Sequence, residues 1–236
     1  MSKVKTLGLL GGLTYQATTI YYNLINSHVR ATLGKRHSAP LILHSFDAEV
    51  MLSYAQKGDW APFGAAMATA SKNLEASGAD AIVITAVLPH KVYDDVVAAV
   101  SKNCPVLHIA DMTAKDILAA GKTKVALLGA KDVMEADFIK GRLSKDHGLE
   151  VFVPDEAGRN EVNRLMYDEV AAGIVKPETK AFIKRTAENL VKQGAECLIL
   201  GSTDLGFVLQ EGDLDVPMFT TAVCHARGVA EWALQS

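Results

Sequence analysis

Short apolar runs alternate along the chain with longer segments whose apolar residues recur at the helical period. This alternation is typical of a parallel sheet with helices on its faces, so we expect an α/β fold. The predicted strands are Val4 to Leu10, Leu41 to His44, Ala81 to Thr85, Val106 to Leu107, Lys124 to Leu128, Val151 to Val153, Cys197 to Leu200 and Met218 to Phe219. The clearest helices are Tyr15 to Thr32, Phe63 to Ala76, Ala114 to Ala120, Glu135 to Lys145, Asn160 to Ala172 and Pro177 to Lys192.

The order of these elements repeats in the second half of the chain. Residues 5–12 align without gaps on residues 123–130, and residues 78–84 align on residues 194–200. The separation between the two matched segments is almost equal in both halves. The sequence therefore predicts two copies of one α/β unit.

Ligands of open parallel sheets bind just beyond the C-terminal ends of the strands. If a pseudo-twofold axis relates the two copies, the strand ends of one copy face those of the other, and the predicted site is a cleft between the halves. Its walls would come from Gly11 to Tyr15, His44 to Phe46, Thr85 to His90, Gly129 to Asp132 and Gly201 to Asp204.

Composition and charge exclude several classes of protein. The 236 residues are 49% hydrophobic and 22% charged, which argues against disorder and against a disulfide scaffold. A formal charge of -3, from 24 basic and 27 acidic residues, favours neither nucleic acid nor an anionic membrane surface. No apolar stretch approaches the ~18 residues of a membrane span, and no secretory signal is evident, so we expect a cytoplasmic protein. Three cysteines without a Cys-x-x-Cys pair predict no metal site.

Six separated motifs resemble those of the aspartate/glutamate racemase family, in the family's order. They are residues 9–14 (Leu-Leu-Gly-Gly-Leu-Thr), 89–91 (Pro-His-Lys), 107–111 (Leu-His-Ile-Ala-Asp), 134–138 (Met-Glu-Ala-Asp-Phe), 201–204 (Gly-Ser-Thr-Asp) and 225–226 (His-Ala). The resemblance implies two similar α/β domains with the active site between them, and a homodimer. We expect a first domain over residues 1–112, joined by the C-terminal helix 221–236, and a second over residues 113–220.

The resemblance also implies a reaction. Racemases of this family use no cofactor and invert Cα with two facing thiols, one in a Cys-Asn-Thr segment and one in Gly-Cys-Thr-Glu. A thiol suits this task because its pKa of about 8.5 allows a reactive thiolate. Counted from the shared Gly-Ala, the first thiol position is Ala86 and the second is Ser202, and a one-residue shift would put Thr85 in place of Ala86. Neither position carries sulfur.

Other departures weaken the case for two-thiol racemisation further. Val87 and Leu88 stand where Asn and Thr are expected, and Ala171 stands where some relatives carry a lysine. Apolar side chains there would leave a charged group poorly solvated. The expected ligand is still a small carboxylate, without a cofactor, because the rest of the resemblance is retained.

Several polar groups remain as candidates for binding or chemistry. The turn of Gly12, Leu13 and Thr14 either offers backbone N–H groups to a carboxylate or is only a tight strand-to-helix turn. His44 and His90 each follow a strand and either act as bases near neutral pH or bridge backbone groups.

Ser202, Thr203 and Asp204 form the best remaining polar cluster at a strand end. Three functions stay open: an isomerase or lyase in which His or Ser replaces the thiols, a hydrolase in which Ser202 pairs with His90 or His225, and a non-catalytic homologue. Cys224, beside His225, is the one thiol whose reactivity deserves a test.

Overall fold

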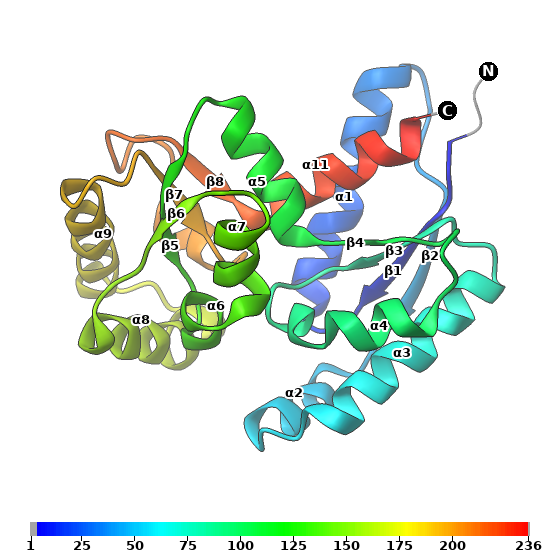
Figure 1. Ribbon diagram of the computed structural model, residues 1–236, viewed down its shortest axis with the longest axis horizontal. Coiled ribbons are helices and arrows are strands. Elements are labelled where there is room, and N and C mark those ends of the chain that lie inside the picture. Colours follow the sequence, from blue (N-terminus) through cyan, green and yellow to red (C-terminus); the bar gives the residue numbers. More distant parts are fainter. Residues whose placement is uncertain (1–3, 236) are drawn as a thin grey trace. The chain divides into compact units, whose positions relative to one another are not determined.

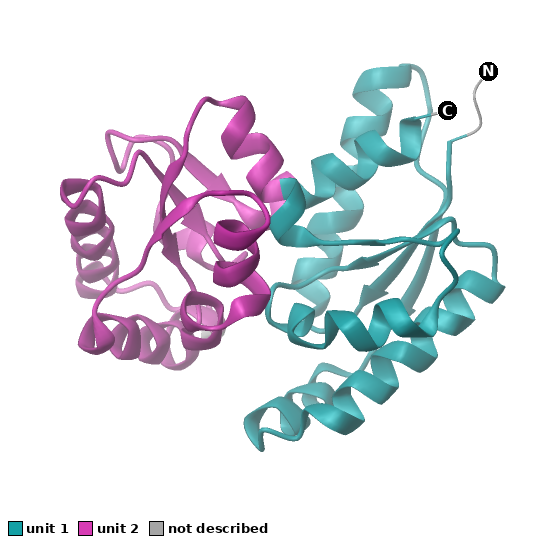
Figure 2. Cartoon of the chain, in the orientation of Figure 1, with its two compact units in different colours: residues 1–112, 225–236 teal, residues 113–224 magenta. Residues whose placement is uncertain are grey.

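The computed structural model describes residues 4–235, and it divides into two compact units. Unit 1 contains residues 1–112 and 225–236, and unit 2 contains residues 113–224 (Figure 2). The chain leaves unit 1 within helix α5 (Ile109–Ala119) and returns to it within helix α11 (Thr221–Leu234). Both crossings are therefore helical.

Unit 1 is built on a four-stranded parallel sheet (Figure 1). Its strands are β1 (Leu7–Gly11), β2 (Leu41–Ser45), β3 (Ala81–Ile84) and β4 (Val106–Leu107), in the order β2-β1-β3-β4. Every residue of β1 and β3 is buried, because helices cover both faces of the sheet. The strand ends that precede the candidate residues therefore belong to the rigid core.

Helices pack on both faces of this sheet. They are α1 (Tyr15–Leu33), α2 (Ala48–Gln56), α3 (Trp60–Ala76), the 3₁₀ turn η1 (Leu88–Val92), α4 (Tyr93–Ala99), the first turn of α5 and most of α11. Helix α3 contributes Phe63, Met67 and Leu74 to one core cluster, which also holds Leu10 and Ile84. The helix begins at Trp60 rather than at Phe63, and Trp60 packs against the same core cluster.

Unit 2 has a sheet of the same type. Its strands are β5 (Lys124–Leu128), β6 (Glu150–Phe152), β7 (Cys197–Leu200) and β8 (Met218–Thr220), in the order β6-β5-β7-β8 and all parallel. The surrounding helices are α6 (Lys131–Glu135), the π-helical turn η2 (Asp137–Gly141), α7 (Arg142–Lys145), α8 (Glu156–Asp168), η3 (Val170–Ala172), α9 (Pro177–Lys192) and α10 (Leu205–Val208).

The two sheets repeat each other in their hydrogen bonds as well as in their topology. Asp80 donates its backbone N–H to the Thr6 carbonyl, and the aligned Glu196 donates to the aligned Lys124 carbonyl, both at 2.8 Å. In each unit the same acidic side chain accepts a backbone N–H at the start of the central strand. These matched contacts support two copies of one unit.

The α/β prediction is confirmed, and each predicted strand is present with small differences at its ends. The helix predicted over Glu135 to Lys145 is wrong as a single element. Ala136 is extended, at φ -84° and ψ 158°, and separates α6 from the π-helical turn. Alanine fits helical and extended backbone alike, so the apolar pattern does not mark this break. Ser236, the last residue of the predicted C-terminal helix, lies outside the described residues.

Within residues 4–235, no helix is both long and apolar enough to cross a membrane. The same part of the chain contains no group of three or more His, Cys, Asp or Glu residues placed to hold a metal ion.

Gly12 provides a test of the turn after β1. Its φ is +74°, and a Cβ at this position would lie 2.2 Å from the Phe46 carbonyl oxygen. We expect Gly12→Ala to lower the free energy of unfolding by about 2–4 kcal/mol, because both strain and a backbone clash result. Gly58, at φ +70° with open space around it, is the matched control, for which we expect a loss of about 1 kcal/mol. Urea denaturation measures both, and equal losses would contradict the role of the close approach.

Candidate functional site

Thr85 follows β3, and its side chain is buried in the core of unit 1. Its side chain is 1% exposed, and its Oγ1 donates to the Leu10 carbonyl at 3.0 Å. The Thr18 hydroxyl of α1 lies 3.5 Å away. This hydroxyl therefore joins β1, β3 and α1, so it is a poor candidate for moving a proton to or from a ligand.

The next three residues, Ala86, Val87 and Leu88, form an apolar loop whose last residue, Leu88, begins η1. Ala86 is partly buried and packs against the core cluster that contains Leu10, and Val87 is 8% exposed. None of the three side chains can give or accept a proton. The loop supplies no acid, base or nucleophile from its side chains.

The glycine turn after β1 uses part of its hydrogen-bonding capacity within the protein. The Gly12 N–H donates to Thr18 Oγ1 at 2.9 Å, and Thr14 Oγ1 accepts from the Ala17 N–H at 3.4 Å as the N-cap of α1. Leu13 is buried. The turn is therefore a capped strand-to-helix connection, and whether it also binds a carboxylate stays a prediction.

His44 lies on β2, the edge strand of the unit 1 sheet. It is partly buried, and its ring contacts that of Phe46 with centroids 4.5 Å apart. Its backbone neighbour in β1 is Leu10. A role for His44 in binding a ligand stays a prediction.

The polar cluster of unit 2 follows β7. The Ser202 hydroxyl accepts the Asp204 backbone N–H at 3.1 Å and donates to Asp204 Oδ2 at 3.4 Å. Burial raises the pKa of the Asp204 carboxyl, and hydrogen bonds from Ser202 and Thr203 oppose that rise. All three side chains are partly buried, just before α10.

Ala86 and Ser202 occupy matching places in the two units. The Thr85 N–H donates to the Leu10 carbonyl at 3.1 Å, and the aligned Gly201 N–H donates to the aligned Leu128 carbonyl at 2.7 Å. Ala86 and Ser202 are the next residues along the chain. The repeated backbone therefore presents an apolar residue in unit 1 and a hydroxyl in unit 2.

His90 bridges backbone groups inside unit 1. Its Nδ1 lies 2.9 Å from the Ala86 carbonyl oxygen, and its Nε2 lies 3.2 Å from the Ile109 backbone nitrogen. A carbonyl only accepts and an N–H only donates, so the ring must be neutral with its proton on Nδ1. Burial, followed by the nearby His108 and His225, holds the pKa of His90 well below its usual range.

His225 is bound in a similar way by the first unit. Its Nε2 donates to the Leu107 carbonyl at 2.8 Å, and its Nδ1 accepts from the Tyr21 hydroxyl at 2.9 Å. Burial lowers the pKa of His225 to about 4. Both ring nitrogens of His90 and of His225 are already engaged, so neither imidazole is free to activate Ser202.

All three cysteines are buried. Burial is the main cause that raises the pKa of Cys104 and of Cys197 to about 11. Cys224 is 3% exposed. Because a thiolate is the reactive form of cysteine, burial disfavours reactivity at these positions.

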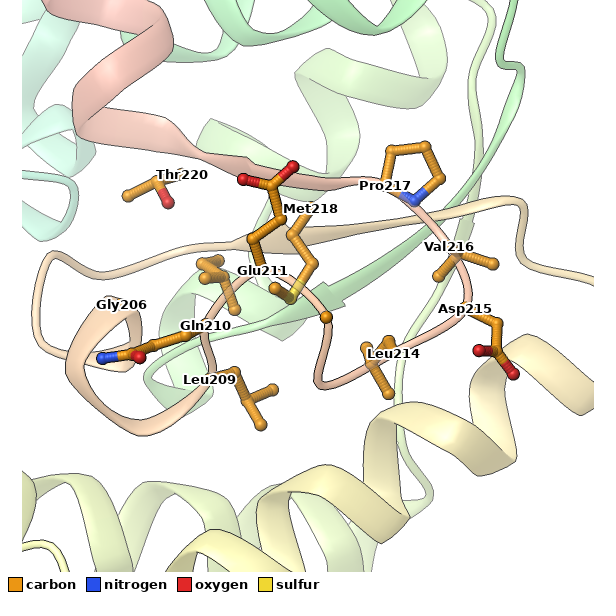
Figure 3. A pocket seen from close by; sticks show the side chains of 12 residues that line it. Gly206, Leu209, Gln210, Glu211, Leu214, Asp215, Val216, Pro217, Met218 and Thr220 are labelled. Carbon is orange, nitrogen blue, oxygen red and sulfur yellow. The ribbon is translucent and has the colours of Figure 1, made fainter.

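A pocket of about 740 Å³ lies in unit 2, where the chain runs from α10 through a loop to β8 (Figure 3). Its lining residues are Leu200, Gly206, Leu209, Gln210, Glu211, Gly212, Leu214, Asp215, Val216, Pro217, Met218 and Thr220. Two of these are acidic and none is basic, and the Ser202 cluster is not among them. The pocket therefore does not suit a carboxylate ligand.

The sequence did not predict the residues that support the strand ends of unit 1, nor those that surround His90 and His225. Thr18 orders the strand ends, and Tyr21 and His108 help enclose His90 and His225. A threonine and a tyrosine inside an ordinary amphipathic helix carry no local signal of such a contact.

The balance of effects on Asp204 leads to a prediction. We expect Ser202→Ala to raise the pKa of the Asp204 carboxyl, because the substitution removes a hydrogen bond that favours the charged form. A carbon-13 NMR titration of the side-chain carboxyls measures this pKa. Ser53→Ala, which removes an exposed hydroxyl bonded to the Val50 carbonyl, is the control. An unchanged Asp204 titration in Ser202→Ala would contradict the contact.

Comparisons with known proteins agree with this architecture. The chain is 40% identical to a Yersinia pestis protein assigned as an Asp/Glu racemase, whose crystal structure superposes with a TM-score of 0.92 over 98% of this chain and 100% of that one. An aspartate racemase homologue from Pyrococcus horikoshii OT3 is 35% identical over the same shares of the two chains, with a TM-score of 0.84.

A curated relative is more distant. The broad specificity amino-acid racemase RacX of Bacillus subtilis (strain 168) is 28% identical over 158 residues, which are 65% of this chain and 65% of RacX. The sequence model of the Asp/Glu/Hydantoin racemase family matches residues 10–229, which is nearly the whole chain. This protein belongs to the Asp/Glu/Hydantoin racemase family.

Proposed function

We propose that this protein binds a small carboxylate, such as an amino acid, in the interdomain cleft that the family resemblance implies, and that it does not racemise by the two-thiol route. The observation that carries the second part is the pair of residues at the thiol positions, Ala86 and Ser202, which hold matching places in the two units. Binding without a cofactor, a cytoplasmic location and a homodimer complete the proposal, and all three come from the sequence and its resemblance.

The missing sulfur matters because of acid strength. A thiol is partly ionised near neutral pH, whereas a serine hydroxyl is not and an alanine has no proton to exchange. A positioned acid or base typically contributes about 10² to 10⁴-fold to a rate, so losing both should be severe. The three cysteines that the chain does have are buried.

The alternatives differ in how well the geometry supports them. A Ser202 hydrolase would need a histidine with a free ring nitrogen, and both nitrogens of His90 and of His225 are engaged inside unit 1. An isomerase or lyase would need polar groups at a strand end, and the Ser202–Asp204 pair after β7 provides them. A non-catalytic binding protein fits the apolar loop of Ala86, Val87 and Leu88 equally well. Proton exchange separates these last two.

Ligand binding and Cα exchange are the first measurements. We expect calorimetry to detect saturable binding of at least one member of a panel of L- and D-aspartate, L- and D-glutamate and 2-hydroxy acids. In heavy water, NMR should then find no racemisation of the bound ligand by the unaltered protein. Deuterium incorporation at Cα that disappears in Ser202→Ala would show that Ser202 takes part in proton transfer, as an isomerase requires. Binding of none of these carboxylates would contradict the proposed ligand class.

Restoring sulfur tests whether the chemistry alone is missing. We expect the double variant Ala86→Cys/Ser202→Cys to racemise a bound amino acid at least about 10²-fold faster than either single variant, since the reaction needs both groups. The two single variants are the matched controls, and polarimetry or chiral chromatography follows the product. Equal rates in the double and the single variants would contradict the assignment of these two positions.

A further inference from the structure

Three buried histidine rings lie together in unit 1, and the proposed function uses none of them. The centroids of His90 and His108 are 4.6 Å apart, those of His90 and His225 are 5.8 Å apart, and no ring is more than 2% exposed. Tyr93 packs edge-on against His108 at 4.6 Å, and Tyr21 against His225 at 5.5 Å. We call His90, His108 and His225 the histidine cluster.

The cluster joins segments that are far apart in the sequence. His90 connects the loop at Ala86 to the first residue of α5, and His225 connects α11 to the Leu107 carbonyl at the end of β4 and to Tyr21 on α1. At its other end, α11 is held by a hydrogen bond of 2.9 Å from the Lys5 N–H to the Ala233 carbonyl, and by Lys5 over the Trp232 ring. The cluster therefore holds the end of α11 that enters unit 1.

The hydrogen bonds of the cluster require neutral rings. Protonation of His90 would place a new N–H on Nε2, directly against the Ile109 N–H at 3.2 Å. Protonation of His108 would do the same at Nδ1, which now accepts the Ala110 N–H at 3.0 Å. Both donors are backbone N–H groups at the start of α5, so an added proton at either ring replaces a hydrogen bond with two opposed N–H groups.

The groups beside the cluster act on its charge in both directions. The titratable groups that face the cluster include Tyr21 from α1, Tyr93 from α4 and Asp111 from α5, in addition to the histidines themselves. Asp111 favours the charged form of His225, but burial outweighs it. His108 and His225 both disfavour charge on His90, because cations at this separation would repel one another.

We propose that the histidine cluster is an acid-sensitive latch that holds α11 and the loop at Ala86 in unit 1 and releases both when its rings are protonated. The neutral latch is closed at pH 7 and above. Because folded His90 and His225 resist protonation, the closed state loses stability as the pH falls below the unfolded histidine pKa of about 6.5 and continues to lose it toward about 4, where folded His225 titrates.

Release is expected to be local rather than global. Of the seven histidines of the chain, only His147 lies in residues 113–224, and it is partly buried rather than enclosed with other histidines. Histidine protonation between pH 6.5 and 5 therefore acts on unit 1. Carboxylates are mostly ionised throughout that range, so they add little to the change.

Trp232 provides a reporter on α11. The chain has two tryptophans, Trp60 and Trp232, so a Trp60→Phe variant leaves Trp232 as its one tryptophan. We expect its fluorescence emission to shift to longer wavelength as the pH falls from 6.5 to 5, while far-UV circular dichroism keeps most of its helical signal. The opening constant should rise by up to about tenfold per pH unit for each of His90 and His225, or about a hundredfold for both.

Glutamine substitutions separate protonation from packing. The Gln side chain has an NH₂ group that donates and a carbonyl oxygen that accepts, so His90→Gln and His225→Gln keep both hydrogen-bonding types without a titratable ring. In the Trp60→Phe background, we expect the double glutamine variant to lose most of the pH-dependent emission change, since only His108 of the cluster remains, and the exposed His37→Gln control to keep it. An unchanged transition in the double variant, or its loss in the control, would overturn the proposal.

A measurement on the unaltered protein covers the case in which the glutamine variants do not fold. Nitrogen-15 NMR of the histidine rings at pH 7 should find the proton of His90 on Nδ1 and that of His225 on Nε2. Both rings should titrate together with the Trp232 emission change. The proposal fails if either ring titrates with no change at Trp232, or if the helical signal of the whole chain disappears in the same transition.

Discussion

A single backbone hydrogen bond in each unit sets the position of the candidate residues. In unit 1 it runs from the Thr85 N–H to the Leu10 carbonyl, and in unit 2 from the Gly201 N–H to the Leu128 carbonyl. In unit 1 the bond joins the residue after β3 to Leu10 of β1, and in unit 2 it joins the residue after β7 to Leu128 of β5. The side chain that follows, Ala86 or Ser202, is therefore placed by core strands that cannot shift without breaking the sheet. A change of residue at these positions alters chemistry without requiring a change of fold.

The two copies use their polar groups differently. In unit 1 the groups near the end of β3 support the fold, since the Thr85 hydroxyl binds the Leu10 carbonyl and His90 bridges Ala86 and Ile109. In unit 2 the Ser202 hydroxyl and the Asp204 carboxyl lie partly exposed after β7. The two units share their sheet topology and matched backbone hydrogen bonds, while the side chains at these matching places differ.

Burial decides what the histidines can do. An imidazole in solution is protonated or neutral near pH 6.5 with little cost in either direction, whereas His90 and His225 are enclosed and their two nitrogens are occupied. The same enclosure that makes them unsuitable as partners for Ser202 makes them effective joints between helices and strands. Their ring nitrogens hold together segments of unit 1.

The sequence by itself determined the α/β class, the strands and the duplication, because buried parallel strands read as short apolar runs and the matched segments recur at matched spacing. It also determined that positions 86 and 202 lack sulfur. The break at Ala136 escaped it, since alanine carries no conformational signal there. Only the tertiary structure decided that the side chains of Thr85 and His225 hydrogen-bond within the core of unit 1. Those contacts join residues such as Leu10 and Thr85, or Tyr21 and His225, and no local pattern encodes a hydrogen bond between partners so far apart along the chain.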